Sequence, residues 1–221
     1  PRLLSQNGYF TGMAGKWHVG QVPEGVELPV LEADADLADP QVQERLAARQ
    51  RLYEALVREH GGFDYAAGVV WANYDNHPVE ALRFHNFPWM SKGALEFLDA
   101  AAQGDQPFFL YFTPTAIHGP NHVADLEKDV TLTPEGRVPE VGNYQLDRQR
   151  LQEAMTNLPA GVRHRYAGMA QIDYQLGLLR DKLDSLNLAD NTVILFMSDH
   201  NIEPGKATSY EKGIHIPMIV Y

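Results

Sequence analysis

The fold is indicated most directly by an uninterrupted apolar run that reads Pro107-Phe108-Phe109-Leu110-Tyr111-Phe112-Thr113. An apolar run of this kind, without alternating polar residues, is typical of a strand buried on both faces of a parallel sheet. Residues 91–103 before it and 162–186 after it predict helices, because apolar residues recur there at helical spacing. The inward face of the second helix is expected to hold Tyr166, Met169, Ala170, Asp173, Leu176, Leu179 and Leu183.

The same pattern extends to both ends of the chain. Gly8 is expected to close a short N-terminal helix and to precede a strand over residues 9–14. A third helix is predicted over 40–60, and further buried strands over 192–198 and 216–221. Helices that alternate with apolar strands predict an α/β fold, a mainly parallel sheet sandwiched by helices. Residues 119–160, rich in proline and charge, predict a mostly irregular excursion within the domain.

Composition limits the classes of partner. The 221 residues suffice for one large domain, and no apolar stretch is long enough to predict a membrane span. The net charge of −11, from 18 basic and 29 acidic residues, argues against nucleic acid as a partner. The chain has no cysteine, so it has neither a disulfide framework nor a thiolate metal site. The compartment and the oligomeric state stay open.

Two side chains that can bind an anion follow the first predicted strand. Lys16 and His18 lie two residues apart, so both can point into one cleft at the carboxyl end of the sheet, where ligands of α/β folds gather. A tetrahedral anion needs several converging cations, and lysine is a suitable point charge. The alternatives are a solvated surface lysine and a structural histidine bonded to the backbone. Trp17 between them is expected in the core.

His118 follows the apolar run that ends at Thr113. An imidazole there can donate a hydrogen bond to an anion or protonate a leaving alcohol. His122, four residues on, could form a zinc pair with His118 only on a helix, and Pro120 lies between them. We therefore interpret His122 as a loop residue.

A metal site is predicted at the end of the strand over 192–198. Asp199 would place a carboxylate there, and a hard divalent cation would compensate its charge. If His200 is a second ligand, its imidazole shifts the preference from calcium toward manganese or zinc. Calcium remains the first expectation. The alternative for Asp199 is a turn or helix cap.

Four segments, in order along the chain, carry a family resemblance. They are Gly8-Tyr9-Phe10-Thr11-Gly12-Met13-Ala14-Gly15-Lys16-Trp17-His18-Val19-Gly20, Pro107–Phe112 with Ile117-His118-Gly119-Pro120, Ser198-Asp199-His200-Asn201, and Gly205-Lys206-Ala207-Thr208-Ser209-Tyr210-Glu211-Lys212-Gly213-Ile214-His215-Ile216-Pro217. Together they resemble the sulfatase branch of the alkaline-phosphatase superfamily. The resemblance covers nearly the whole chain and implies an alkaline-phosphatase-like fold that is incomplete, because residues 1–221 are expected to be an internal part of the catalytic domain.

The resemblance also implies residue roles. Lys16, His118 and Lys206 would bind the sulfate group, and His18, His118 and Lys206 would take part in catalysis. Asp199 and His200 would bind the metal. The nucleophile, a formylglycine formed from Cys or Ser in a C/S-x-P-S-R motif, and further metal-binding aspartates are expected upstream. The chain alone is therefore expected to be inactive.

Three positions depart from the family pattern. Asn201 and Lys212 stand where the family has glycine, and His215 replaces an arginine. The implied substrate is a sulfate ester of a sugar or small molecule, and the resemblance does not identify the alcohol. Two alternatives stay open: a phosphodiesterase or phosphonate monoester hydrolase of the same superfamily, and a non-catalytic domain that binds a sulfated ligand.

Overall fold

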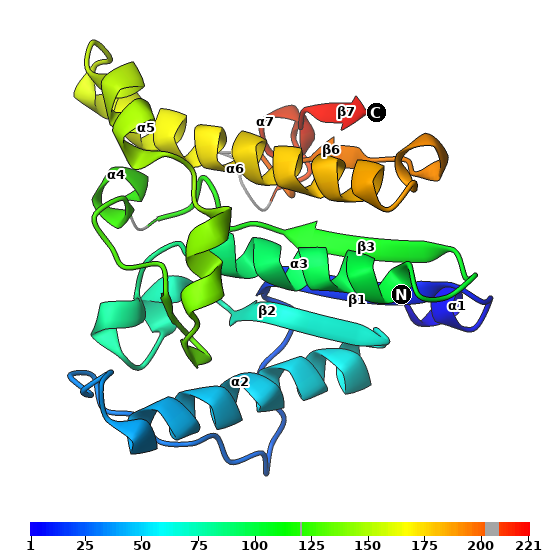
Figure 1. Ribbon diagram of the computed structural model, residues 1–221, viewed down its shortest axis with the longest axis horizontal. Helices are drawn as coiled ribbons and strands as arrows, with labels where there is room; N and C mark the ends of the chain where they lie inside the picture. Colours follow the sequence, from blue (N-terminus) through cyan, green and yellow to red (C-terminus); the bar gives the residue numbers. More distant parts are fainter. Residues whose placement is uncertain (120, 202–207) are drawn as a thin grey trace. The chain divides into compact units, whose positions relative to one another are not determined.

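The computed structural model describes residues 1–119, 121–201 and 208–221 (Figure 1). These residues form two compact units, Pro1–Lys182 and Leu183–Tyr221. The first unit contains a three-stranded parallel sheet with helices around it, and the second contains a two-stranded antiparallel sheet. The predicted α/β class, with a parallel sheet flanked by helices, is confirmed.

The parallel sheet is centred on β1 (Phe10–Trp17). It pairs on one side with β2 (Tyr65–Trp71) and on the other with β3 (Phe108–Thr113), so that the order is β2-β1-β3. The expectation that β3 is buried on both faces is wrong, since Tyr111 is 47% exposed. β3 lies at the edge of this sheet, and the covering helices pack mainly on β1 and β2.

Helices cover both faces of the sheet. α2 (Pro40–Gly61) packs Val57 against Met13 of β1. α3 (Phe87–Ala101) lies over the opposite face, because a Cβ at the adjacent Gly12 would collide with the ring of Phe97. Successive strand residues point to opposite faces, so these two contacts place α2 and α3 on different sides of β1. Figure 1 shows both helices running along the sheet.

Local sequence signals set the ends of these helices. The Asp39 side chain accepts a hydrogen bond from the backbone N–H of Gln41 at 2.8 Å, and Pro40 occupies the first turn. Gly62, with a left-handed φ of 75°, ends α2. α3 begins four residues earlier than predicted, because the side chain of Asn86 caps it.

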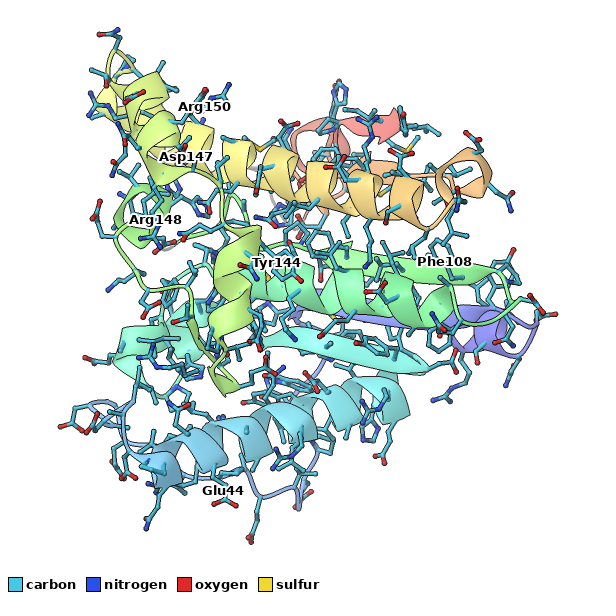
Figure 2. The ribbon with its side chains drawn as sticks, viewed as in Figure 1. Glu44, Phe108, Tyr144, Asp147, Arg148 and Arg150 are labelled. Atoms are coloured by element: carbon cyan, nitrogen blue, oxygen red, sulfur yellow. The ribbon has the colours of Figure 1, made fainter. Side chains whose placement is uncertain are left out.

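The segment 119–160 contains more structure than the mostly irregular excursion that its sequence predicts. Its elements are α4 (His122–Asp125), β4 (Leu132–Thr133), β5 (Gly136–Arg137), the 3₁₀ helix η3 (Pro139–Tyr144) and α5 (Arg148–Met155). Capping explains the two helices. Asn121 Oδ1 accepts from the backbone N–H of Val123 at 2.9 Å, and Asp147 Oδ1 from that of Arg150 at 3.1 Å (Figure 2).

α6 (Ala160–Ser185) packs on α4 and α5 through Ala167, which joins an apolar cluster with Leu126, Leu151 and Met155. The predicted inward face is partly wrong, because Tyr166, Met169 and Asp173 are exposed. The buried positions include Ala167, Gly168, Gln171, Ile172, Gln175, Leu179 and Leu183. Because two glutamines and a glycine belong to this buried face, apolar residues at helical spacing do not mark it in the sequence.

The second unit contains η4 (Ala189–Asn191), β6 (Leu195–Met197), α7 (Glu211–Ile214) and β7 (Met218–Val220). β6 and β7 pair antiparallel, in register from Leu195–Val220 to Met197–Met218. The expectation of buried strands here is wrong, since Leu195 is 59% and Met218 60% exposed.

The remaining short elements belong to the first unit and are α1 (Arg2–Ser5), η1 (Tyr74–Asn76) and η2 (Glu80–Leu82). None of the helices in the described ranges is both long and apolar enough to cross a membrane.

Candidate functional site

The carboxyl ends of β1 and β3 lie side by side. Gly15 is the register partner of Thr113, and Thr113 Oγ1 donates a hydrogen bond to the carbonyl oxygen of Lys16 at 2.8 Å. Lys16 therefore lies within β1, not after it as predicted. The strand continues because Gly15 adopts a φ of 104° and the register with β2 passes over Gly68, whose φ is 61°.

Three predicted site residues are at this edge of the sheet. Lys16 is half-buried at the second-last position of β1, and the exposed His18 follows the strand directly. His118 is also exposed, and its backbone N–H donates to the carbonyl of Thr115 at 3.1 Å in a turn after β3. Its Nδ1 donates to the carbonyl of Gly119 at 2.9 Å. Because β1 and β3 are parallel neighbours, all three residues belong to one end of the sheet.

Trp17 has the core role that its sequence position predicts. Its ring packs against the apolar cluster that contains Met13 and Val57, and meets Phe63 edge to face at 6.2 Å between ring centres. With Trp17 directed into the core, its neighbours Lys16 and His18 are the polar residues that this end of β1 offers to a ligand.

Asp199 and His200 belong to the second unit, where they follow the end of β6 at Met197 after one intervening residue. Asp199 Oδ1 accepts from the backbone N–H of His200 at 2.9 Å, and Asp199 Oδ2 lies 3.2 Å from His200 Nε2. His200 Nδ1 donates to the carbonyl of Asn201 at 2.8 Å, which leaves Nε2 beside the carboxylate. A carboxylate oxygen and an imidazole nitrogen thus lie together, a donor pair that suits a divalent cation with affinity for nitrogen.

The remaining predicted residues have different outcomes. Lys206 lies outside the described residues. Asn201, which replaces a glycine of the family pattern, donates from Nδ2 to the carbonyl of His215 at 3.0 Å and from its backbone N–H to that of Gly213 at 3.2 Å. The side chain of His215 is exposed, with Nδ1 3.6 Å from Glu211 Oε1.

Sequence reasoning missed one cluster, formed by His85, His122 and Asp125. The interpretation of His122 as a loop residue is wrong, because it begins α4 and is fully buried. Its spacing to Asp125 and the cap at Asn121 are signals for a short helix with both side chains on one face. The partner His85 is 37 residues from His122, and no local pattern links the two.

Comparison with known proteins identifies the family. The sulfatase family model matches residues 1–221, and the chain therefore belongs to the sulfatase family. Human arylsulfatase A is 25% identical over 99% of this chain and 41% of its own length. An uncharacterized sulfatase of Schizosaccharomyces pombe is 25% identical over 92% of this chain and 40% of its own. Human iduronate 2-sulfatase is 28% identical over 58% of this chain and 29% of its own length.

The solved structures most useful for comparison share the fold. The crystal structure of Ps i-CgsB in complex with k-i-k-neocarrahexaose has a TM-score of 0.56 at 22% identity, covering all of this chain and 46% of that protein. The yidJ protein of Bacteroides fragilis has a TM-score of 0.54 at 22% identity, and the match covers 99% of this chain and 48% of that protein. The resemblance to the alkaline-phosphatase-like fold of sulfatases is confirmed. The chain spans about two fifths of the length of its first curated relatives.

Proposed function

We propose that this chain supplies the anion-binding part, and part of the metal site, of an enzyme that hydrolyses sulfate monoesters. The observation that carries the proposal is the parallel pairing of β1 and β3, in register at Gly15 and Thr113. It sets Lys16, His18 and His118 at one end of the sheet in a chain of the sulfatase family. An ammonium group and hydrogen-bond-donating imidazoles are groups that can stabilise a tetrahedral, dianion-like sulfur centre.

Each side chain has a proposed role. The Lys16 ammonium neutralises charge on a sulfate oxygen. The exposed His118 donates a hydrogen bond to the sulfate and protonates the leaving alcohol. His18 acts as the acid–base group that returns the enzyme to its starting state. Lys206 is proposed to bind the same sulfate group.

The proposed metal ligands in this chain are Asp199 and His200. Their oxygen and nitrogen donors, 3.2 Å apart, fit manganese or zinc as well as the calcium first expected. The cation supplies, when bound, charge compensation for the sulfate oxygens. The chain contains no cysteine and no C/S-x-P-S-R sequence. We therefore propose that the formylglycine nucleophile and the other metal ligands lie in an upstream segment, and that these 221 residues alone have no turnover.

The proposed substrate is a sulfated sugar or a small sulfate ester. Iduronate 2-sulfatase, among the relatives, is named for a sulfated sugar. The net charge of −11 disfavours long polyanionic chains, which would be repelled beyond the immediate site.

The test uses the protein extended upstream to include the nucleophile segment. Hydrolysis of matched aryl sulfate, phosphate and phosphonate esters is compared, and the highest kcat/KM is expected for the sulfate. Lys16→Gln and His118→Gln are expected to lower this kcat/KM by ~10²–10³-fold, the usual loss when one charge-stabilising or acid–base group is removed. His60→Gln, an exposed histidine at the end of α2, is the control and should leave the rate unchanged.

Two other results would change the assignment. Faster hydrolysis of the phosphodiester or phosphonate would identify the second class of hydrolase. Tight binding of a sulfated ligand without turnover would identify a binding domain.

A further inference from the structure

Three side chains of the kinds that bind metals form a buried cluster in the first unit. His85 precedes α3, whereas His122 and Asp125 lie on α4. The three are 3%, 0% and 7% exposed. One potential ligand atom from each residue lies within 4.8 Å of the other two. Burial of three ionisable residues at one point is unfavourable unless each finds a partner.

His122 lacks such partners. Among the described residues, neither Nδ1 nor Nε2 of its ring has a hydrogen-bond partner, although both atoms are buried. The ring is stacked on His164 at 4.7 Å and lies 4.2 Å from the His85 ring, measured between ring centres. A buried polar group without a partner costs about 1–3 kcal/mol, so native structures rarely keep one without a reason.

No hydrogen bond joins the His122 ring to Asp125. His122 Nδ1 lies 3.9 Å from Asp125 Oδ2, which would be an ion pair if the imidazole were protonated. The ring nitrogens of histidine and the carboxylate oxygens of aspartate both offer lone pairs to a divalent cation.

We propose that His85, His122 and Asp125 bind one divalent transition-metal ion, with zinc preferred. Zinc accepts two imidazole nitrogens and a carboxylate oxygen, and a water completes its tetrahedron. Calcium and magnesium prefer oxygen ligands and would leave the imidazoles unused. At metal–ligand distances of about 2.0–2.2 Å, tetrahedral ligand atoms lie roughly 3.4 Å apart. The ligand atoms, which lie within 4.8 Å of one another, would have to move closer to reach that spacing when the metal binds.

Neighbouring groups already orient two of the ligands. Thr115 Oγ1 lies 2.6 Å from Nδ1 of His85, within hydrogen-bonding distance. Asp125 Oδ2 accepts from the backbone N–H of His85 at 3.1 Å. Outer partners of this kind hold the ligands of protein metal sites in position.

The site would join two segments that are distant in sequence. It ties α4, which begins four residues after His118, to the residues that precede α3. The metal would therefore fix the connection between β3 and α4 that carries His118. This inference does not depend on the proposed sulfatase activity.

Zinc binding to the purified, chelator-treated protein tests the proposal by titration calorimetry, with Co²⁺ absorption as a probe of tetrahedral coordination. The wild type is expected to bind one tight equivalent that His122→Gln and Asp125→Asn both abolish. His60→Gln and Asp199→Asn should retain it, since these positions lie outside the cluster. Circular dichroism of each metal-free variant checks that it is folded.

Thr115→Val provides a test that keeps all three ligands. It should weaken zinc binding by ~10–100-fold, the usual effect of losing an outer partner of a metal ligand. The proposal is overturned if the wild type binds no zinc at the cluster, if the tight equivalent survives both ligand substitutions, or if Asp199→Asn alone removes it. Unchanged affinity in Thr115→Val would also contradict it.

Discussion

Gly168 lies in the middle of α6 against the ring of His122. A Cβ built there would lie 2.7 Å from Cδ2 and 2.9 Å from Nε2 of that ring, closer than real side chains approach. Gly168→Ala is therefore expected to lower the free energy of unfolding, although the same change in an open helix position raises it by roughly 0.5–1 kcal/mol. Urea unfolding monitored by circular dichroism measures the difference.

Gly177→Ala is the matched control for this prediction. It lies in the same helix, and nothing lies within 4 Å of a Cβ built at that position. We expect a small gain in stability there. Equal gains at both positions would show that the His122 ring is free to move away from α6.

Glu54 predicts a pH dependence of stability. Burial raises the pKa of this α2 carboxyl to about 7, with Glu135 adding to the increase and Gln50 and Arg58 opposing it. The folded protein therefore holds a proton between pH 4.5 and about 7 that the unfolded chain releases. Glu54 should therefore contribute a decrease in the free energy of unfolding as pH rises through this window, and Glu54→Gln should remove that contribution.

Unfolding curves at pH 5 and pH 8 measure this dependence. Glu44→Gln, at an exposed position of the same helix (Figure 2), is the control and should keep the pH dependence of the wild type. A Glu54→Gln profile that overlays the wild-type profile would mean that the carboxylate is solvated in the folded state.

The sequence identifies several candidate site residues, but it does not reveal the buried environment of His122. The sequence is enough to select Lys16, His18 and His118, because each lies close to the end of an apolar strand segment. The environment of His122 cannot be predicted in this way, because it is set by His85, 37 residues earlier, and by α6. Such a partner has no signal in the local pattern, and Pro120 favoured the wrong interpretation.

Among the elements, β1 depends on a glycine just before Lys16. Gly15 has a φ of 104°, and a Cβ there would collide with the carbonyl oxygen of Thr113 in β3. Gly15→Ala combines backbone strain of about 1–3 kcal/mol with that collision. We expect it to destabilise the protein more than Gly20→Ala, by at least about 1 kcal/mol.

Gly20 is a suitable control because its φ is also positive, 85°, while nothing lies within 4 Å of a Cβ built there. The comparison isolates the β1–β3 contact from the backbone strain that both variants share. Similar unfolding free energies for the two variants would show that β3 can shift without loss.

Elements with local signals were predicted best. α2 begins at Pro40, as expected, because Asp39 and Pro40 form a capping sequence, and Gly62 ends it. The inward face of α6 was partly wrong, because Gln171 and Gln175 are buried there. Gln175 Nε2 donates to the carbonyl of Tyr144 at 3.1 Å, a tertiary partner that no periodicity reveals.

For the molecule as a whole, the sequence predicts the family better than it predicts burial. The four motifs run in order through both units, and the family match covers residues 1–221. The apolar runs around 192–198 and 216–221 predict buried strands by the same rule that identified the parallel sheet. In the structure they form a two-stranded ribbon with exposed side chains. A run of apolar residues indicates that a strand is suited to burial, but it does not show whether another layer of the protein covers that strand.

This difference between the units predicts unequal protection of their backbone amides. A two-stranded ribbon is marginally stable by itself, and Leu195 and Met218 bury too little apolar surface to reinforce it. Met13 in β1, by contrast, is fully buried between two covering layers. Opening free energies within one protein range from near zero to the global value. Amides of β6 and β7 should therefore exchange at least ~100-fold faster than those of β1, measured by hydrogen exchange. Equal protection would mean that the ribbon opens only when the parallel sheet unfolds.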